Sequence, residues 1–401
     1  MDTHSSIPAH VPAALVRDID LYNLPGSQQD VHLAWKRVQD ECPDIFYTPR
    51  YGGHWVIARA ELLDRIWADH ERFSSDRAVG IPRMPDVPAQ LPIEVDPPTH
   101  RYFREPLNLA LSPKAVQHLA ERARASSIEL IENFRPKGAC EFVSDFAEHV
   151  PMEVFLSIVD LPASDREWLV RRASTMARNP SLEAKGQAQQ EIFGYLGGWL
   201  QKRRSNLGED LLSKILQVQV GDRPITADEA MLACALALFG GLETVASAMS
   251  FSMRYLALYP EQRRQLTRHP EQIPAAVEEL LRRYSIPTVG RRLTQDVTLN
   301  GVTMKAGDYV QLTSCLHGLD ERKWPNSLRV DFDRMGLDGH MAFGRGIHKC
   351  PGANLARAEL RVFLEEWLPR IPDFGINPGA EPITASGSAA GVLRLPLVWP
   401  V

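Results

Sequence analysis

The sequence predicts a mainly α-helical protein with a minor β region. Most of the chain from Pro98 to about residue 285 repeats its apolar residues at helical spacing, whereas strand-like segments gather after Arg291. An earlier stretch, residues 28–72, combines polar helix-like segments with a short strand candidate at Trp55 to Ala58. With no internal repeat and no linker, we expect one domain over 1–401. Its β-containing parts would lie at about 28–60 and 291–401, and its helical part at about 98–290.

The elements follow in chain order. Between Ile81 and Pro98, six prolines exclude a helix or the interior of a sheet, so this stretch is predicted to be a long loop. Such a loop is either a lid over a binding site or a disordered surface segment. The helical periodicity that begins at Pro98 is broken at 136–138, at Pro162 and at 221–224. Later strands are expected at 308–312 and 392–399.

A long central helix is predicted from Thr226 to Tyr259. Thr226 and Glu229 form a capping box, and the helix ends before Pro260. From Met231 to Leu242 it is apolar nearly all round, which indicates a helix that crosses the protein interior. We do not expect it to span a membrane, because Glu243 interrupts the apolar run after about 13 residues, and a span needs roughly 20.

Two adjacent glycines lie in the middle of this helix, in Gly240-Gly241-Leu242-Glu243-Thr244. Each costs about 1 kcal/mol relative to alanine inside a helix, so a compensating reason is required. One explanation is close packing against another helix. The other is that the helix passes over a flat cofactor and opens its hydrogen-bond ladder, while the acid and alcohol of Glu243-Thr244 supply and hold protons.

Composition and charge narrow the class of protein. The 401 residues include 44% hydrophobic residues, enough for a substantial core. A net charge of -5 and a pI near 6.2 argue against a nucleic-acid-binding protein. Five scattered cysteines fit neither a disulfide framework nor a zinc ribbon, and they favour a reducing compartment. The N-terminal 21 residues lack the apolar core of a signal peptide or an anchor, so we expect a cytoplasmic protein outside the membrane.

A glycine-punctuated loop near the C-terminus presents one cysteine, in Phe343-Gly344-Arg345-Gly346-Ile347-His348-Lys349-Cys350-Pro351-Gly352. The glycines allow backbone amides to turn toward the sulfur, and a thiolate held in this way can be the axial ligand of a haem iron. The alternatives are a turn with a buried structural cysteine or a zinc site that uses His348 and Cys350. Zinc needs three or four ligands, and the sequence offers no second cluster.

The pattern Phe-Gly-x-Gly-x-His-x-Cys-x-Gly resembles the haem-binding signature of the cytochrome P450 haem-thiolate monooxygenases. Gly240 to Thr244 is similar to the oxygen-activation motif of that family, with Glu in place of the commoner Asp. Glu279 and Arg282 match its Glu-x-x-Arg motif, and Arg334 is the candidate third member of that structural trio. The resemblance therefore implies the P450 fold, with haem between the long central helix and the cysteine loop.

The resemblance also implies roles for residues around haem b. Cys350 would be the iron ligand, and Thr244 and Glu243 would deliver protons. His100 and Arg104, a turn apart after the Asp96-Pro97-Pro98 motif, match a His-x-x-x-Arg helix that binds the haem propionates. The remaining cofactor-binding candidates are Arg291, Phe343, His348 and Gly352.

Within the family, the chain resembles the bacterial camphor 5-monooxygenase class most closely, over most of its length. Its predicted pocket differs. Matching the Asp-Pro-Pro motif places Pro88 where the camphor enzyme has the tyrosine that donates a hydrogen bond to the substrate ketone, and proline has no side-chain donor. The expected pocket is mainly apolar and consists of Val79, Pro88, Leu236, Phe239, Gly240, Pro287, Val289, Ser388 and Ala389. We therefore expect a small hydrophobic terpenoid or norisoprenoid, such as an ionone-like ketone, rather than camphor.

The implied activity is hydroxylation of that substrate with O2 and two electrons. The implied partner is a [2Fe-2S] ferredoxin served by an NAD(P)H-dependent ferredoxin reductase, and the protein is expected to be a monomer. Arg345, Lys349, Arg101 and Arg104 would attract an acidic ferredoxin, unless they are merely scattered surface charge. Competing hypotheses are a peroxygenase that uses H2O2 directly and a haem-binding sensor without turnover. Neither would have much need of the Glu243-Thr244 pair.

Overall fold

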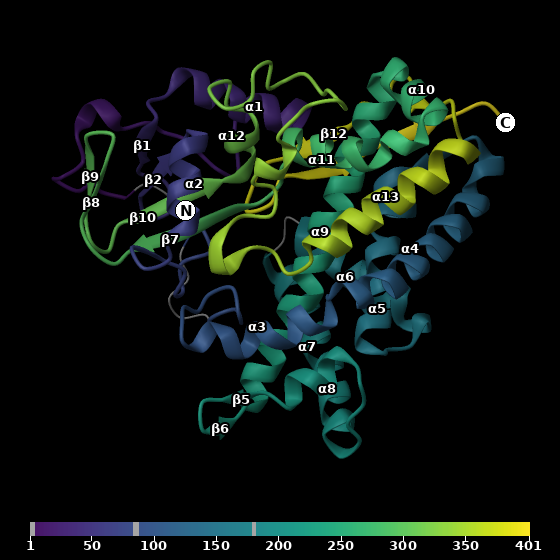
Figure 1. Cartoon of the computed structure of the whole chain (residues 1–401), viewed down its shortest axis with the longest axis horizontal. Helices are drawn as coiled ribbons and strands as arrows, with labels where there is room; N and C mark the ends of the chain where they lie inside the picture. The colour runs from purple at the N-terminus through teal and green to yellow at the C-terminus, as the bar shows by residue number, and fades with distance from the viewer. Residues whose placement is uncertain (1–4, 83–87, 179–181) are drawn as a thin grey trace. The chain divides into compact units, whose positions relative to one another are not determined.

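The computed structural model describes residues 5–82, 88–178 and 182–401 of the chain (Figure 1). Helices account for 54% of the protein and the sheets are small, so the mainly α prediction is confirmed. The chain forms two compact units. Unit 1 comprises Met1–Asp96, Glu278–Cys350 and Ile383–Gly391, and unit 2 comprises Pro97–Val277, Pro351–Pro382 and Val392–Val401.

Unit 1 is built on a five-stranded sheet of order β1-β2-β10-β7-β3. Its strands are β1 (Ile45–Thr48), β2 (His54–Ile57), β3 (Phe73–Ser74), β7 (Thr288–Leu293) and β10 (Tyr309–Thr313). β2 and β10 pair in parallel, whereas the other neighbours are antiparallel. All residues of β1 and β2 are buried, as their aromatic and β-branched composition predicts. The two strands expected in this unit are present, each shifted by one residue.

Short helices complete unit 1. They are α1 (Ser27–Glu41), α2 (Ala60–Ala68) and α12 (Ser314–Gly318). The unit also contains a hairpin of β8 (Val297–Leu299) and β9 (Val302–Met304), and the strand β12 (Ile383–Ala385). A Cβ atom added to Gly318 would lie 2.0 Å from the carbonyl oxygen of Arg282. Glycine is therefore required where α12 meets the end of α11 (Ile273–Arg283).

The described part of the proline-rich stretch forms turns and extended loop, as predicted. Pro82, Pro88, Pro92, Pro97 and Pro98 belong to this part. Residues 83–87, with the remaining proline of the six, lie outside the described residues. The choice between a lid and a surface segment stays a prediction.

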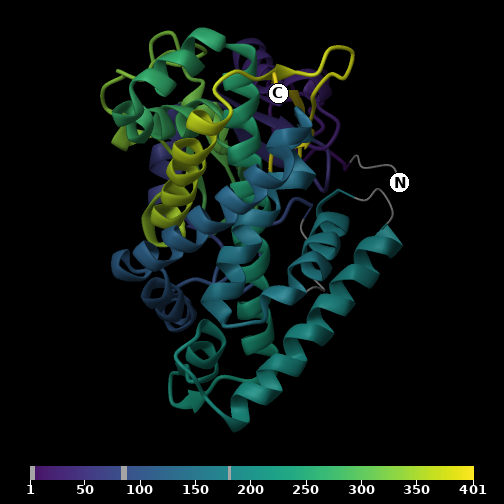
Figure 2. The ribbon, with the colours of Figure 1, turned by 90° about the vertical axis from the view of Figure 1, so that its right-hand side faces the viewer.

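Unit 2 is a helical assembly. Its helices are α3 (Thr99–Ala110), α4 (Pro113–Phe134), α5 (His149–Val159), α6 (Arg166–Arg178), α7 (Leu182–Ser205), α8 (Leu211–Leu216), α9 (Ala227–Leu258), α10 (Pro260–Arg268) and α13 (Ala353–Arg370). α13 runs along α4 (Figures 1 and 2). Around Trp367 of α13, the rings of Phe134, Phe142 and Phe146 lie with centroids 5.2–5.5 Å from the indole and form the aromatic core of this unit.

The small strands of unit 2 correct one sequence prediction. They are β4 (Ala139–Glu141), β5 (Gln219–Val220), β6 (Arg223–Pro224), β11 (Gly375–Ile376) and β14 (Pro396–Val398), with β13 (Gly391–Arg394) beginning at the unit boundary. The single strand expected over 392–399 is split at Leu395. The backbone N–H of Leu395 donates to the carboxylate of Glu141 and its carbonyl accepts from Phe142 N, so both groups are engaged outside a regular ladder.

The central helix α9 begins where its capping box predicts. Thr226 Oγ1 accepts from the backbone N–H of Glu229 at 3.2 Å, and the Glu229 carboxylate accepts from Thr226 N at 2.9 Å. Among the described helices α9 alone is long and apolar enough to span a membrane, by criteria that buried core helices of soluble proteins also meet. Within unit 2 it packs against α5, α7 and α13.

Candidate active site

The cysteine loop is shaped by glycines that no other residue could replace without strain. Gly344 and Gly346 have φ values of +65° and +72°. A Cβ atom on Gly346 would lie 2.8 Å from the carbonyl oxygen of Trp67 in α2, so the loop rests directly on this helix. The backbone N–H of Cys350 donates to Phe343 O at 2.9 Å and closes the loop. This hydrogen bond fixes the position of the Cys350 backbone, from which the thiol side chain projects.

The thiol of Cys350 is exposed, unlike those of the other cysteines. Cys140, Cys234 and Cys315 are buried, and burial raises the pKa of each thiol well above its usual range. They behave as small apolar core residues. Burial also raises the pKa of the half-buried Cys42. A buried structural role, the alternative weighed for Cys350, therefore does not fit this residue.

Beside the cysteine loop, the carboxylate of Asp96 interacts with three neighbouring groups. Its Oδ1 lies 3.6 Å from His348 Nε2 and accepts from the backbone N–H of Ser75 at 3.1 Å, and its Oδ2 accepts from the hydroxyl of Ser74. Burial opposes ionisation of the carboxyl, but the nearby His348 imidazole and the hydrogen bonds from Ser74 and the Ser75 backbone outweigh it and lower the pKa of Asp96 to about 2. Asp96 is thus an anion that can orient the His348 ring by its charge.

Arg291 of β7 is a buried cation in the same unit. Its residue is 4% exposed, and its Nη1 donates to Gly290 O at 2.7 Å. Burial lowers the pKa of the guanidinium to about 10, and the nearby charge of Asp96 opposes this. A guanidinium at this depth needs anionic compensation. A haem propionate would supply it, so Arg291 fits the cofactor on physical grounds.

The middle of α9 shows an open face on an otherwise buried helix. Gly240, Gly241 and Glu243 are exposed, and Thr244 is half-buried, whereas 245–253 are mostly buried. A Cβ atom on either glycine would meet no atom within 4 Å in the described structure. Close helix packing therefore does not explain the two glycines. The open strip at these exposed residues leaves the flat-cofactor explanation as the one of the two that still applies.

The expected opening of the α9 hydrogen-bond ladder is wrong. The helix continues without interruption through Gly240 and Gly241. The hydroxyl of Thr244 donates to Gly240 O at 3.0 Å, a bond to the carbonyl four residues earlier that helical threonines make without breaking the helix. Its oxygen can still accept a hydrogen bond from water, because a hydroxyl has two lone pairs. Leu236 and Phe239, half-buried, precede it on the helix.

The other propionate candidates lie on α3, also in unit 2. His100 is buried, and Arg104, half-buried, lies one turn later. Arg104 Nε donates to Asn108 Oδ1 at 2.9 Å. The helix starts at Thr99, so Pro98 precedes the first turn rather than occupying it. Gly352 caps the N-terminus of α13 in the same unit.

Five of the predicted pocket residues meet around β7 in unit 1. Pro287 forms a β-bridge with Ala389, and Thr288 N donates to Ser388 O at 2.8 Å. On the next residues of the strand, Gly290 N donates to Val79 O at 2.9 Å. The resulting cluster contains Val79, Pro287, Val289, Ser388 and Ala389. Pro88 is exposed.

Sequence reasoning missed two residues that hold this cluster. The hydroxyl of Tyr22 donates to Ile81 O, and the carboxylate of Glu94 accepts from Val79 N at 3.2 Å. Neither residue belongs to a recognisable motif. Only the position of Glu94 two residues before Asp96, at the end of the proline-rich stretch, could have drawn attention to it.

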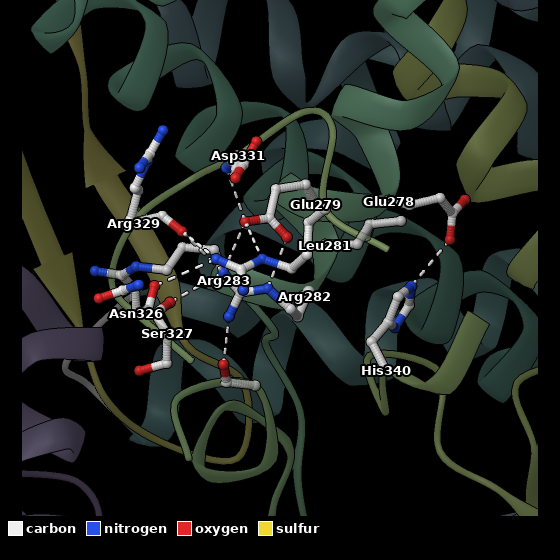
Figure 3. A network of polar contacts seen from close by, with 12 residues as sticks. Glu278, Glu279, Leu281, Arg282, Arg283, Asn326, Ser327, Arg329, Asp331 and His340 are labelled. Atoms are coloured by element: carbon white, nitrogen blue, oxygen red, sulfur yellow. Dashed lines mark hydrogen bonds and ion pairs between the residues drawn. The ribbon is translucent and has the colours of Figure 1, made fainter. Parts of the chain in front are cut away.

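The trio of Glu279, Arg282 and Arg334 forms a buried network in unit 1 (Figure 3). Arg282 donates to both carboxylate oxygens of Glu279, from Nε at 2.7 Å and from Nη2 at 2.8 Å. Arg334 Nε donates to Glu279 Oε1 at 3.0 Å. The side chains of Glu279 and Arg282 have no exposed surface. Burial lowers the pKa of Arg282 although Glu279 favours its charged form.

The network also links to backbone and to the cysteine loop. Arg282 donates to the carbonyl of Ser327 (Figure 3). It also donates to the carbonyl of Gly318, and Arg334 donates to that of Pro325. Next to Glu279, Glu278 Oε2 lies 2.9 Å from Nε2 of His340. The ring of His340 is 6.1 Å from that of Phe343, which starts the cysteine loop.

Comparison with known proteins decides the family. Over 98% of its length, and 97% of the relative's, the chain is 36% identical to a probable cytochrome P450, 127A1, from Sinorhizobium fredii (strain NBRC 101917 / NGR234). The chain belongs to the cytochrome P450 family. The family model for cytochrome P450 matches residues 268–371.

Solved P450 structures agree with the fold. The crystal structure of cytochrome P450 CYP101C1 has a TM-score of 0.90 and 39% sequence identity, covering 99% of this chain and all of that one. CYP101J2 follows with a TM-score of 0.88 and 34% identity over 99% of this chain. A further P450 relative, the mycinamicin IV hydroxylase/epoxidase of Micromonospora griseorubida, is 30% identical over 91% of this chain and 93% of its own.

Family membership establishes the chemistry in outline. The protein is a P450 monooxygenase that binds haem b and acts with O2, an organic substrate and a redox partner. When bound, haem supplies the iron at which O2 is activated, and a thiolate ligand donates electron density to that iron. The exposed Cys350, the buried Arg291 and the open strip of α9 are suited to such a group.

Proposed function

We propose that this P450 hydroxylates a small hydrophobic terpenoid or norisoprenoid, with an ionone-like ketone as the expected class. The observation that carries the proposal is the β7 cluster. Backbone contacts bring the segments of Val79, Pro287, Val289 and Ala389, four residues with apolar side chains, to one strand, and Ser388 adds one hydroxyl. Apolar pockets with a few polar groups are typical of sites for small hydrophobic ligands.

Camphor is expected to bind poorly. Pro88 has no side-chain donor for a ketone, and it is exposed. Titration of the ferric enzyme with camphor and with β-ionone tests this, because a substrate that displaces water from the haem converts the iron from low to high spin. Strong conversion by camphor, or none by β-ionone, would contradict the proposed substrate class.

We propose Cys350 as the iron ligand. The reduced enzyme should bind carbon monoxide with the absorption band specific for thiolate ligation, and Cys350→Ser should lose that band. Cys42→Ser is the matched control, because Cys42 is the only other cysteine that is not buried among the described residues. Retention of the band in Cys350→Ser would refute the assignment.

Glu243 and Thr244 are proposed to move protons. Glu243 is exposed on the open strip of α9, so its carboxyl can exchange a proton with water, and the Thr244 oxygen can hold a water beside it. His100, Arg104, Arg291 and Phe343 are proposed to retain the cofactor, together with His348 and Gly352.

The proposed electron donor is a [2Fe-2S] ferredoxin served by an NAD(P)H-dependent reductase. Arg345 and Lys349 precede Cys350 in the cysteine loop and are exposed, which supports attraction of an acidic partner. Such attraction weakens as ionic strength rises, so the rate of reduction by ferredoxin should fall with added salt. A salt-independent rate would argue against it. A cytoplasmic, monomeric, single-domain enzyme remains part of the proposal.

A further inference from the structure

The side chain of Glu94 binds the backbone at two places: at Val79, just before the proline-rich stretch, and at Gln90, within it. The segments around these two residues are called the two limbs of the stretch. Glu94 Oε1 accepts from the backbone N–H of Val79 at 3.2 Å, and its Oε2 accepts from that of Gln90 at 3.0 Å. Its own backbone takes part as well, because Glu94 N donates to Gln90 O at 2.8 Å and Glu94 O accepts from Arg77 N at 3.3 Å. Glu94 therefore joins the segment 77–79 to the segment 90–94 by hydrogen bonds.

The limb that Glu94 holds is fixed from its other side by the sheet. Val79 O accepts from Gly290 N of β7 at 2.9 Å, and a Cβ atom on Gly290 would lie 2.3 Å from Ala78 O. The limb thus presses directly on the strand that carries Val289. Arg77 O accepts from the hydroxyl of Tyr309 at 3.0 Å, next to this contact.

A carboxylate is the side chain that this arrangement requires. Both of its oxygens are acceptors, and two N–H groups from different limbs point at them. An amide of the same shape would turn its NH2 group toward one of these donors and lose that hydrogen bond. Removing the acceptor leaves the part-buried N–H of Val79 without its partner, which costs free energy, whereas the exposed N–H of Gln90 can turn to water.

We propose that Glu94 is a positioning residue for substrate selection: by clamping Val79 against β7, it sets where the Val79 side chain stands in the substrate pocket. This inference rests on the proposed function, which places Val79 in the pocket. The substrate then meets a fixed wall instead of a loop that must be ordered on binding, and preorganisation of this kind raises affinity by lowering the ordering cost.

The test compares Glu94→Gln and Glu94→Ala with Glu71→Gln, an exposed glutamate outside the clamp. Two probes are titrated into the ferric holoenzyme: β-ionone, through the spin-state change, and 4-phenylimidazole, which ligates iron and fills the pocket with its ring. We expect Glu94→Gln to raise both dissociation constants about tenfold, equivalent to about 1.4 kcal/mol. Glu94→Ala should raise them further, and Glu71→Gln should change neither.

Two readouts separate positioning from general loss of structure. The carbon monoxide band of Glu94→Gln should match that of the wild type, and the variant should stay folded at the assay temperature although its unfolding midpoint falls, while the hydroxylated product distribution and the coupling of NADH to product change. Hydrogen exchange of peptides covering 75–82 should quicken in this variant. Unchanged dissociation constants together with unchanged product distribution would overturn the proposal.

These measurements also separate a wrong substrate class from a wrong role for Glu94. If wild-type enzyme gives no spin change with β-ionone, the substrate class is wrong, and 4-phenylimidazole affinity and hydrogen exchange still judge the clamp. If exchange over 75–82 quickens while 4-phenylimidazole binds as before, Glu94 orders the loop without acting on the pocket, and the positioning role is refuted.

Discussion

Removal of the Glu279 carboxylate should be among the most destabilising single changes in unit 1. Glu279 accepts two hydrogen bonds from Arg282 and one from the backbone N–H of Asp331 at 3.0 Å (Figure 3). It accepts a further one from Arg334, also at 3.0 Å. In Glu279→Gln the Arg282 guanidinium stays buried without its counter-charge. Breaking a buried pair in this way costs about 3–5 kcal/mol.

The neighbouring residue provides the control. Glu278 is 25% exposed and pairs with the imidazole of His340 rather than with a buried guanidinium, so Glu278→Gln should cost at most about 1 kcal/mol. Urea titration followed by far-ultraviolet circular dichroism measures both, with the slope m compared between variants. A loss in Glu279→Gln of under about 1 kcal/mol, or one equal to that of Glu278→Gln, would refute the reasoning.

Three further predictions concern single residues: Glu359, Gly318 and Thr244. Burial raises the pKa of Glu359 to about 8 from 4.5, so its contribution is fully present below about pH 4.5 and is lost as pH rises through about 8. The free energy of unfolding should fall by about 1.4 kcal/mol per pH unit between them, and Glu359→Gln should flatten that profile in urea titrations. Gly318→Ala forces a methyl group against Arg282 O and should lower the thermal midpoint, at a cost of about 1–3 kcal/mol. Thr244→Ala should leave NADH consumption intact but divert it from product to peroxide; unchanged coupling would contradict the role proposed for its hydroxyl.

The elements that the sequence predicted well carry local signals. The capping box of α9 involves Thr226 and Glu229, three residues apart, so both partners are visible in one stretch of sequence. The break at Leu395 is different, because it depends on the Glu141 carboxylate, which lies 254 residues earlier in the chain. Such long-range competition for a backbone N–H leaves no trace in the periodicity of 392–399.

The candidate site shows the same difference between local sequence signals and long-range contacts. Motif spacing pointed to Cys350, to Thr244 and to the Glu279 trio, since these residues occupy fixed patterns. Motif spacing did not reveal what holds them or their neighbours. Asp96 orients His348 and Glu94 clamps Val79, through contacts between segments that are distant in the chain or separated by an irregular loop.

Glycine shows most clearly why sequence alone was insufficient. Gly346 and Gly240 both lie in glycine-rich motifs, and the sequence alone does not show which of them the backbone requires. In the structure the reasons are opposite. Gly346 has a positive φ and no room for a methyl group beside Trp67, so its glycine is required for folding of the loop. Gly240 is helical with open space around it, and alanine there would favour the free protein by about 1 kcal/mol. The chain forgoes that stability, and no contact of the described residues with Gly240 explains why.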